Sequence, residues 1–70
     1  MKITIIGANS YIARNFIWYV QNNIDSDTEM KLYDFQEKHV DGLPDYERVD
    51  YSDKDSIRKI DFNSDMIYIF

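Results

Sequence analysis

The segment formed by residues 2–6 constrains the fold of this chain more than any other, because four of its five residues are β-branched. Isoleucines face both sides of such a strand, which is typical of a strand buried inside a parallel sheet. Gly7 ends the run abruptly, and the good N-cap residues Asn9 and Ser10 follow it. The sequence therefore predicts a buried strand, a tight turn and a helix over about residues 10–22.

Apolar residues recur along this predicted helix at the spacing of one helical face. The expected stripe has Ile12, Phe16, Tyr19 and Val20 on it, with Ala13, Ile17 and Ile24 beside it.

A second strand is predicted over residues 29–33, with Met30 and Leu32 facing inward, and it stops at Asp34. Residues 35–46 are polar and contain two turn dipeptides, so they are expected to form a loop. Residues 47–49 predict a short third strand.

The C-terminal part repeats the alternation of helix and strand. Residues 52–55 have the spacing of a capping box with Ser52 as the cap, and Ile57 and Ile60 would lie on one side of a short helix. Residues 66–70 predict a fourth strand. Strands that alternate with helices indicate an α/β fold with a parallel sheet.

Length and charge narrow the possible functions. Seventy residues make one domain at most. The 8 basic and 13 acidic residues give a net charge of −5, whereas binding to nucleic acid or an anionic membrane requires a basic face. There is no cysteine, and the single histidine, His39, lies in the polar loop. We therefore expect no metal, no nucleic-acid partner and no membrane partner. We expect a cytoplasmic protein, because no apolar stretch approaches the roughly 20 residues that span a bilayer.

The turn after the first strand carries a phosphate-binding pattern. In the spacing GxxGxxG, Gly7 stands at the first position, Ser10 at the second and Ala13 at the third. A glycine permits the tight turn, and small residues let backbone N–H groups approach a pyrophosphate and let the helix pack close to the sheet. The helix N-terminus adds a partial positive charge. With one glycine of three, the pattern also fits an ordinary strand–turn–helix junction.

Asp34 strengthens the interpretation of this turn as a dinucleotide site. It stands at the end of the second predicted strand, 21 residues after Ala13. Dinucleotide-binding folds place an acid about 20 residues on, where it bonds the ribose hydroxyls of the adenosine. A carboxylate there repels a 2′-phosphate, so NAD is favoured over NADP.

Three segments together resemble the NAD-dependent epimerase/dehydratase family, the extended short-chain dehydrogenase/reductases. Residues 5–16 resemble its opening strand and Gly-Ala-Thr-Gly-Phe-Ile-Gly-type loop. Residues 49–53 are similar to its Gly-Asp-Ile-x-Asp segment, and residues 65–70 to its Asp-x-Val-x-His-x fourth strand. The resemblance implies a Rossmann-type parallel sheet with flanking helices, in which residues 1–70 form the N-terminal half of a doubly wound NAD(P)-binding domain.

The resemblance also implies a set of cofactor-binding residues. They are Gly7, Asn9, Ser10, Tyr11, Ile12, Asp34, Asp50, Tyr51 and Phe70. Gly7 and the backbone at Tyr11 and Ile12 would hold the pyrophosphate. Ser10 replaces the family's glycine where the backbone meets the phosphate most closely, and Val49 stands where a glycine is usual.

The remaining residues of the set would hold the adenosine half of the cofactor. Asp34 would bind the ribose, while Asp50 and Tyr51 would flank the adenine, with Asp50 accepting a hydrogen bond from its amino group. Phe70 would line the cofactor crevice at the end of the fourth strand.

The family's catalytic Tyr-x-x-x-Lys pair has no counterpart in residues 1–70, and the resemblance places it beyond the fourth strand together with the substrate-binding part. We therefore expect the NAD-binding segment of a nucleotide-sugar epimerase, dehydratase or reductase. The nucleotide sugar would bind the full-length protein, which could form a homodimer. The alternative is a non-catalytic NAD(P)-binding redox sensor or regulatory protein of the same fold. A methyltransferase is less favoured, because its glycines alternate more closely.

Overall fold

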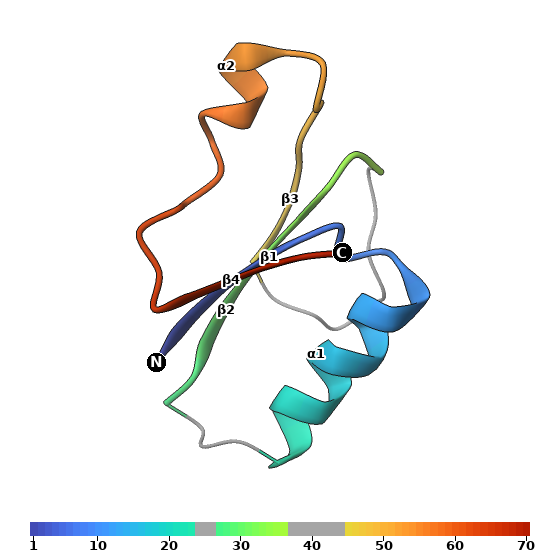
Figure 1. The fold of residues 1–70 in the computed structure, drawn as a ribbon, viewed down its shortest axis with the longest axis vertical. Coiled ribbons are helices and arrows are strands. Elements are labelled where there is room, and N and C mark those ends of the chain that lie inside the picture. Colours follow the sequence, from blue (N-terminus) through green and yellow to red (C-terminus); the bar gives the residue numbers. More distant parts are fainter. Residues whose placement is uncertain (24–26, 37–44) are drawn as a thin grey trace.

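The computed structural model describes residues 1–23, 27–36 and 45–70 (Figure 1). His39, Ile24 and most of the predicted loop lie outside these residues. The elements, in chain order, are β1 (Lys2–Ile6), α1 (Tyr11–Asn23), β2 (Glu29–Asp34), β3 (Tyr46–Arg48), α2 (Lys54–Ile57) and β4 (Met66–Ile69). The predicted order of elements is confirmed, and the predicted ends of the strands and of the first helix differ from the observed ends by at most one residue.

The four strands form one parallel sheet in the order β3-β2-β1-β4. β1 is central, with Ile3 opposite Met30 of β2 on one side and opposite Met66 of β4 on the other. Among the described strands, β3 pairs only with β2, where Tyr46 lies opposite Leu32. The α/β class with a parallel sheet is thus confirmed. Because all four strands run the same way, their carboxyl ends meet at one edge of the sheet.

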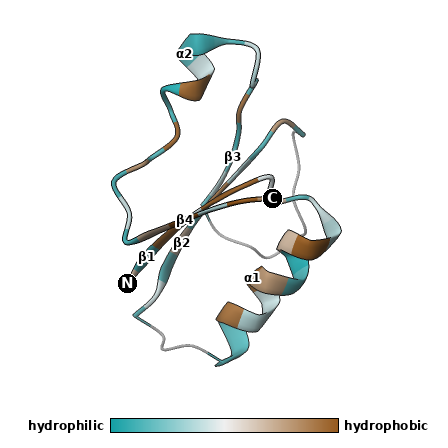
Figure 2. Ribbon diagram, viewed as in Figure 1, coloured by the Kyte–Doolittle hydropathy of each residue, from teal (hydrophilic) through white to brown (hydrophobic). Residues whose placement is uncertain are grey.

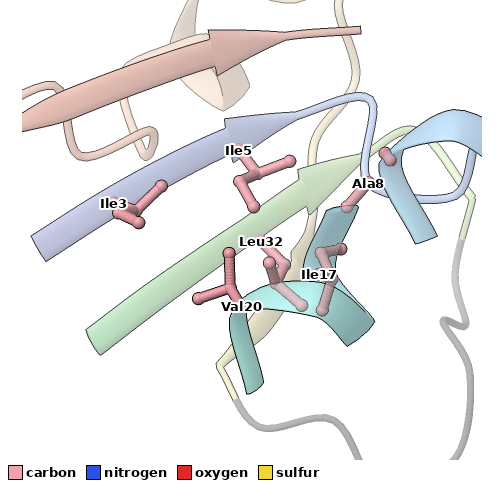
Figure 3. Close-up of a cluster of buried hydrophobic side chains, with 7 residues drawn as sticks. Ile3, Ile5, Ala8, Ile17, Val20 and Leu32 are labelled. Atoms are coloured by element: carbon pink, nitrogen blue, oxygen red, sulfur yellow. The ribbon is translucent and has the colours of Figure 1, made fainter. Parts of the chain in front are cut away.

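α1 covers one face of the sheet and closes the larger core (Figure 1). Figure 3 shows Ile5 and Leu32 on their strands, with Ile17 of α1 close to Leu32. Figure 2 shows hydrophobic residues along both β1 and β4. Those in the middle of β1 are buried, whereas Met66, Ile67 and Ile69 of β4 are exposed. The buried members of this core are Ile3, Ile5, Ala8, Ala13, Ile17, Val20 and Leu32.

The predicted stripe on α1 is wrong for two of its residues. Ala13, Ile17 and Val20 are buried, whereas Ile12 and Tyr19 are 68% and 54% exposed. Ile12 precedes Ala13 by one residue, and this turns its side chain about 100° away from the sheet. The helix has apolar residues on two of its sides. Which of these two sides is buried depends on how the helix packs against the sheet.

The caps of the two helices were predicted with unequal success. Ser10 caps α1 as expected, since its hydroxyl accepts a hydrogen bond from the Ala13 amide at 3.1 Å. The capping box on Ser52 is wrong. The N-cap of α2 is Asp53, whose carboxylate accepts from the Asp55 amide at 3.0 Å. The Ser52 hydroxyl bonds a carboxylate of the preceding turn instead.

The opposite face of the sheet carries a smaller core of Tyr33, Val49 and Ile60. Ile57 packs against it, so the predicted inner side of the second helical segment is confirmed. Thr4, fully buried on β1, bonds the backbone carbonyl of Asp61 at 2.6 Å. Within the described ranges, neither helix has the length and hydropathy needed to cross a membrane.

Candidate functional site

A pocket of about 520 Å³ opens at the carboxyl edge of the sheet. Four segments that are distant in the sequence supply its walls: the turn after β1, the residues after β2, the turn after β3 and the end of β4. The lining residues are Ile6, Gly7, Asn9, Ser10, Asp34, Phe35, Gln36, Tyr51, Ile69 and Phe70. Its volume is in the range of small-molecule sites, and open parallel sheets bind ligands outside the carboxyl ends of their strands.

Gly7 makes the turn at the base of this pocket. Its φ of +83° lies in the left-handed region that residues with a side chain rarely adopt. Its amide donates to the Tyr33 carbonyl at 2.8 Å, which fixes the turn against the end of β2. A Cβ at this position would lie 2.7 Å from the Phe70 carbonyl oxygen, closer than real Cβ contacts come. The glycine therefore allows both the turn and the close approach of β4.

Asp34 lies at the mouth of the turn, only 5% exposed. Its Oδ2 accepts a hydrogen bond from the Asn9 amide at 2.8 Å, and its Oδ1 accepts from the Phe35 amide at 2.7 Å. An ionised carboxylate offers about four acceptor sites, so each oxygen retains room for a further donor. The carboxylate is thus fixed in orientation by two backbone amides while it still lines the pocket.

The N-terminus of α1 presents two further donors. In the described part of the chain, the amides of Tyr11 and Ile12 donate to no acceptor, while the Ala13 amide is taken by Ser10. The first turn of α1 contains no acidic residue. These amides lie at the positive end of the helix dipole, where an anion is stabilised. Neither residue belongs to the pocket lining, so they lie beyond its rim.

Two aromatic side chains form one wall of the pocket. The rings of Phe35 and Tyr51 meet edge to face, with centroids 6.4 Å apart. Burial, followed by the nearby Asp34 carboxylate, raises the pKa of the Tyr51 phenol, so this group is protonated at neutral pH. Aromatic rings of this kind offer flat apolar surface on which a planar base can stack.

Asp50 is not brought to the pocket. It lies outside the lining residues, and its Oδ1 accepts from the Ser52 hydroxyl at 2.7 Å and from the Ser52 amide at 3.0 Å. These hydrogen bonds hold the pKa of the Asp50 carboxyl below its usual value. The contact of Asp50 with an adenine amino group stays a prediction.

Several residues at this end of the sheet were missed by sequence reasoning, among them the pocket-lining Ile6 and Ile69. Phe35 and Gln36 line the pocket, and the Tyr46 hydroxyl lies between the side chain of Asn9 and the Gln36 carbonyl. Phe35 had a usable signal, because a residue directly after the acid at a strand end must lie near the same edge. Tyr46 had none, since its place depends on the register of β3 against β2.

Comparisons of the chain with protein-family models, with curated proteins and with solved structures found no match. Among residues 1–23, 27–36 and 45–70, no group of three or more His, Cys, Asp or Glu side chains could hold a metal ion. The fold and the site thus define an α/β protein with a pocket built from one fixed carboxylate, aromatic walls and the turn that leads into α1.

Proposed function

We propose that this chain is the NAD-binding segment of a nucleotide-sugar epimerase, dehydratase or reductase, folded as the N-terminal half of a Rossmann-type, doubly wound domain. The observation that carries the proposal is the placement of Asp34, which lines the pocket and bonds the backbone of the turn after β1. The strand order supports it as well, because β3-β2-β1-β4 matches the first four strands of the order 3-2-1-4-5-6 of such a domain.

The residues present fit the adenosine half of NAD. The free acceptor sites of Asp34 suit the two ribose hydroxyls, and Phe35 and Tyr51 supply apolar surface for the adenine. The amides of Tyr11 and Ile12, which donate to none of the described residues, suit the negative charge of the pyrophosphate. When bound, the nicotinamide would supply hydride transfer, and the residues of this chain would bind and orient the other half of the molecule.

The same carboxylate favours NAD over NADP. A 2′-phosphate would place a second negative charge beside Asp34, which is buried and accepts hydrogen bonds from the backbone amides of Asn9 and Phe35. Repulsion between like charges is strong where water is largely excluded. We therefore expect the protein to bind NAD more tightly than NADP.

Substitution of Asp34 by Asn tests the proposal. Hydrogen bonds to a charged group contribute about 1.5–3 kcal/mol, so the affinity for NAD should fall about 10- to 100-fold. The affinity for NADP should fall less or rise, because the repelling charge is gone. Asp55→Asn on the exposed side of α2 serves as the matched control.

Isothermal titration calorimetry with NAD and NADP gives both affinities, and circular dichroism shows whether the variant is folded. A loss of folding would lower the affinities for NAD and NADP by the same factor. The ratio of the two affinities therefore reports the effect of the Asp34 charge alone. The proposal fails if the protein binds no NAD at millimolar concentration, or if Asp34→Asn leaves the ratio unchanged.

A non-catalytic redox sensor of the same fold is the second candidate, and Ser10 is the observation that favours it. Its hydroxyl occupies the Ala13 amide, so one donor at the helix N-terminus is withdrawn from a phosphate. An enzyme should change the nicotinamide absorbance when a nucleotide sugar is added to the full-length protein. Binding of NAD without any such change would favour the sensor.

A further inference from the structure

Asn9 connects the two sides of the pocket through two separate hydrogen bonds. Its backbone amide donates to Asp34, and its side-chain Nδ2 donates to the Tyr46 hydroxyl at 2.9 Å. That hydroxyl in turn donates to the backbone carbonyl of Gln36. One phenol oxygen on β3 therefore joins the turn after β1 to the segment after β2.

We propose that Tyr46 is a positioning residue for the dinucleotide, whose hydroxyl fixes the distance between the Asn9 turn and the segment that carries Asp34 and Gln36. The inference rests on the proposed function, since it concerns the same pocket. Tyr46 itself is absent from the pocket lining, so it acts through Asn9 and Gln36, which do line it.

The ring and the hydroxyl of Tyr46 contact different parts of the protein, so their roles can be tested separately. The ring packs against the core beneath α1, and β3 pairs only with β2, opposite Leu32. The hydroxyl alone reaches across to the turn after β1. Replacement by phenylalanine therefore keeps the apolar ring and removes the hydroxyl that links the two segments.

The Asn9 side chain makes one hydrogen bond to Tyr46 through Nδ2, but its other polar atom is unsatisfied among the described residues. Its Oδ1 is buried and accepts no hydrogen bond from the described residues, which is unfavourable for a polar atom. The bond from Nδ2 to Tyr46 is thus the polar contact that orients the side chain. The Tyr46 phenol stays protonated at neutral pH, because burial raises its pKa, so it can donate to Gln36 while it accepts from Asn9.

The test measures the affinity for NAD by calorimetry in Tyr46→Phe. The change removes both hydrogen bonds that join Asn9 to Gln36 through this hydroxyl. We expect about fivefold weaker binding of NAD, an effect of the size of one net hydrogen bond. Tyr19→Phe is the matched control, since Tyr19 lies on the exposed side of α1, and its affinity should equal that of the unmodified protein.

A double-mutant cycle distinguishes positioning from a general loss of stability. If Tyr46 acts through Asn9, then Tyr46→Phe should change the affinity less than twofold in an Asn9→Ala background. A structural role would instead give effects that multiply, as independent sites do. Asn9→Ser, which also removes the Nδ2 donor, replaces Asn9→Ala if that variant does not fold.

Each outcome decides between the two proposals. If the unmodified protein binds no NAD, the proposed function fails and this inference fails with it. If the unmodified protein binds NAD and Tyr46→Phe binds it equally well, or the two effects multiply, the proposed function stands and only the positioning role is overturned.

Discussion

Two isoleucines on α1 provide a matched test of how the helix packs on the sheet. Ile17 is 1% exposed, whereas Ile12, one and a half turns earlier, is 68% exposed. We predict that Ile17→Ala destabilises the protein strongly and that Ile12→Ala does not. Because both changes are made in the same helix, the gain in helix propensity on changing Ile to Ala is the same in each and cancels in the comparison.

The size of the effect follows from the atoms removed. The change deletes three carbons, which at about 0.8 kcal/mol each gives roughly 2.4 kcal/mol of lost transfer free energy at the buried position. A residual cavity between α1 and the sheet adds to this, within the range of about 2–5 kcal/mol known for such changes. In a domain of this size the melting temperature should fall by roughly 10 °C or more.

Thermal unfolding followed by circular dichroism measures the melting temperature of both variants. Ile12→Ala should melt within about 4 °C of the unmodified protein, since surface changes away from special features alter stability by less than about 0.5 kcal/mol. Equal losses at the two positions, or a larger loss at Ile12, would show that α1 packs with a different face on the sheet.

Two further substitutions test the turn and an ion pair, both by thermal unfolding. Gly7→Ala should cost at least about 1–2 kcal/mol, because φ is +83° and the new Cβ meets the Phe70 carbonyl; unchanged stability would contradict this turn geometry. The Lys2 ammonium lowers the pKa of the Asp61 carboxyl. Asp61→Asn should therefore lower the melting temperature at pH 7. The difference should shrink as the pH falls below about 4, the pKa of an unperturbed aspartate, and vanish only below the lowered pKa of the native carboxyl, where that group is protonated. Asp55→Asn, at an exposed pair, should change little at either pH.

Local patterns were sufficient to predict most of the fold. The β-branched run of β1, the turn at Gly7 and the cap at Ser10 are each determined by residues close in sequence. The face of α1 was predicted less well, because Ile12 and Tyr19 are as apolar as the residues that are buried. Their exposure depends on which side of the helix meets the sheet, and this is a tertiary property.

In the candidate site, too, some features could be predicted from local sequence and others depend on tertiary packing. The spacing from the turn to Asp34 predicted that both belong to one cofactor site. The structure brings them together, because adjacent parallel strands have their carboxyl ends at the same edge. The link through Tyr46 could not be predicted, since it requires the register of β3 against β2 and the rotamer of Asn9. Long-range contacts of single side chains of this kind carry no local sequence signal.

The central claim is that NAD lies at the carboxyl edge of the sheet, with its ribose on Asp34. Titration of the ¹⁵N-labelled protein with NAD, followed by the backbone amide chemical shifts, tests it most directly. We predict the largest changes in residues 7–13 and 34–36 and at Tyr51, with α2 unaffected. The absence of any saturable change, or changes confined to α2 or to the far end of α1, would contradict the claim.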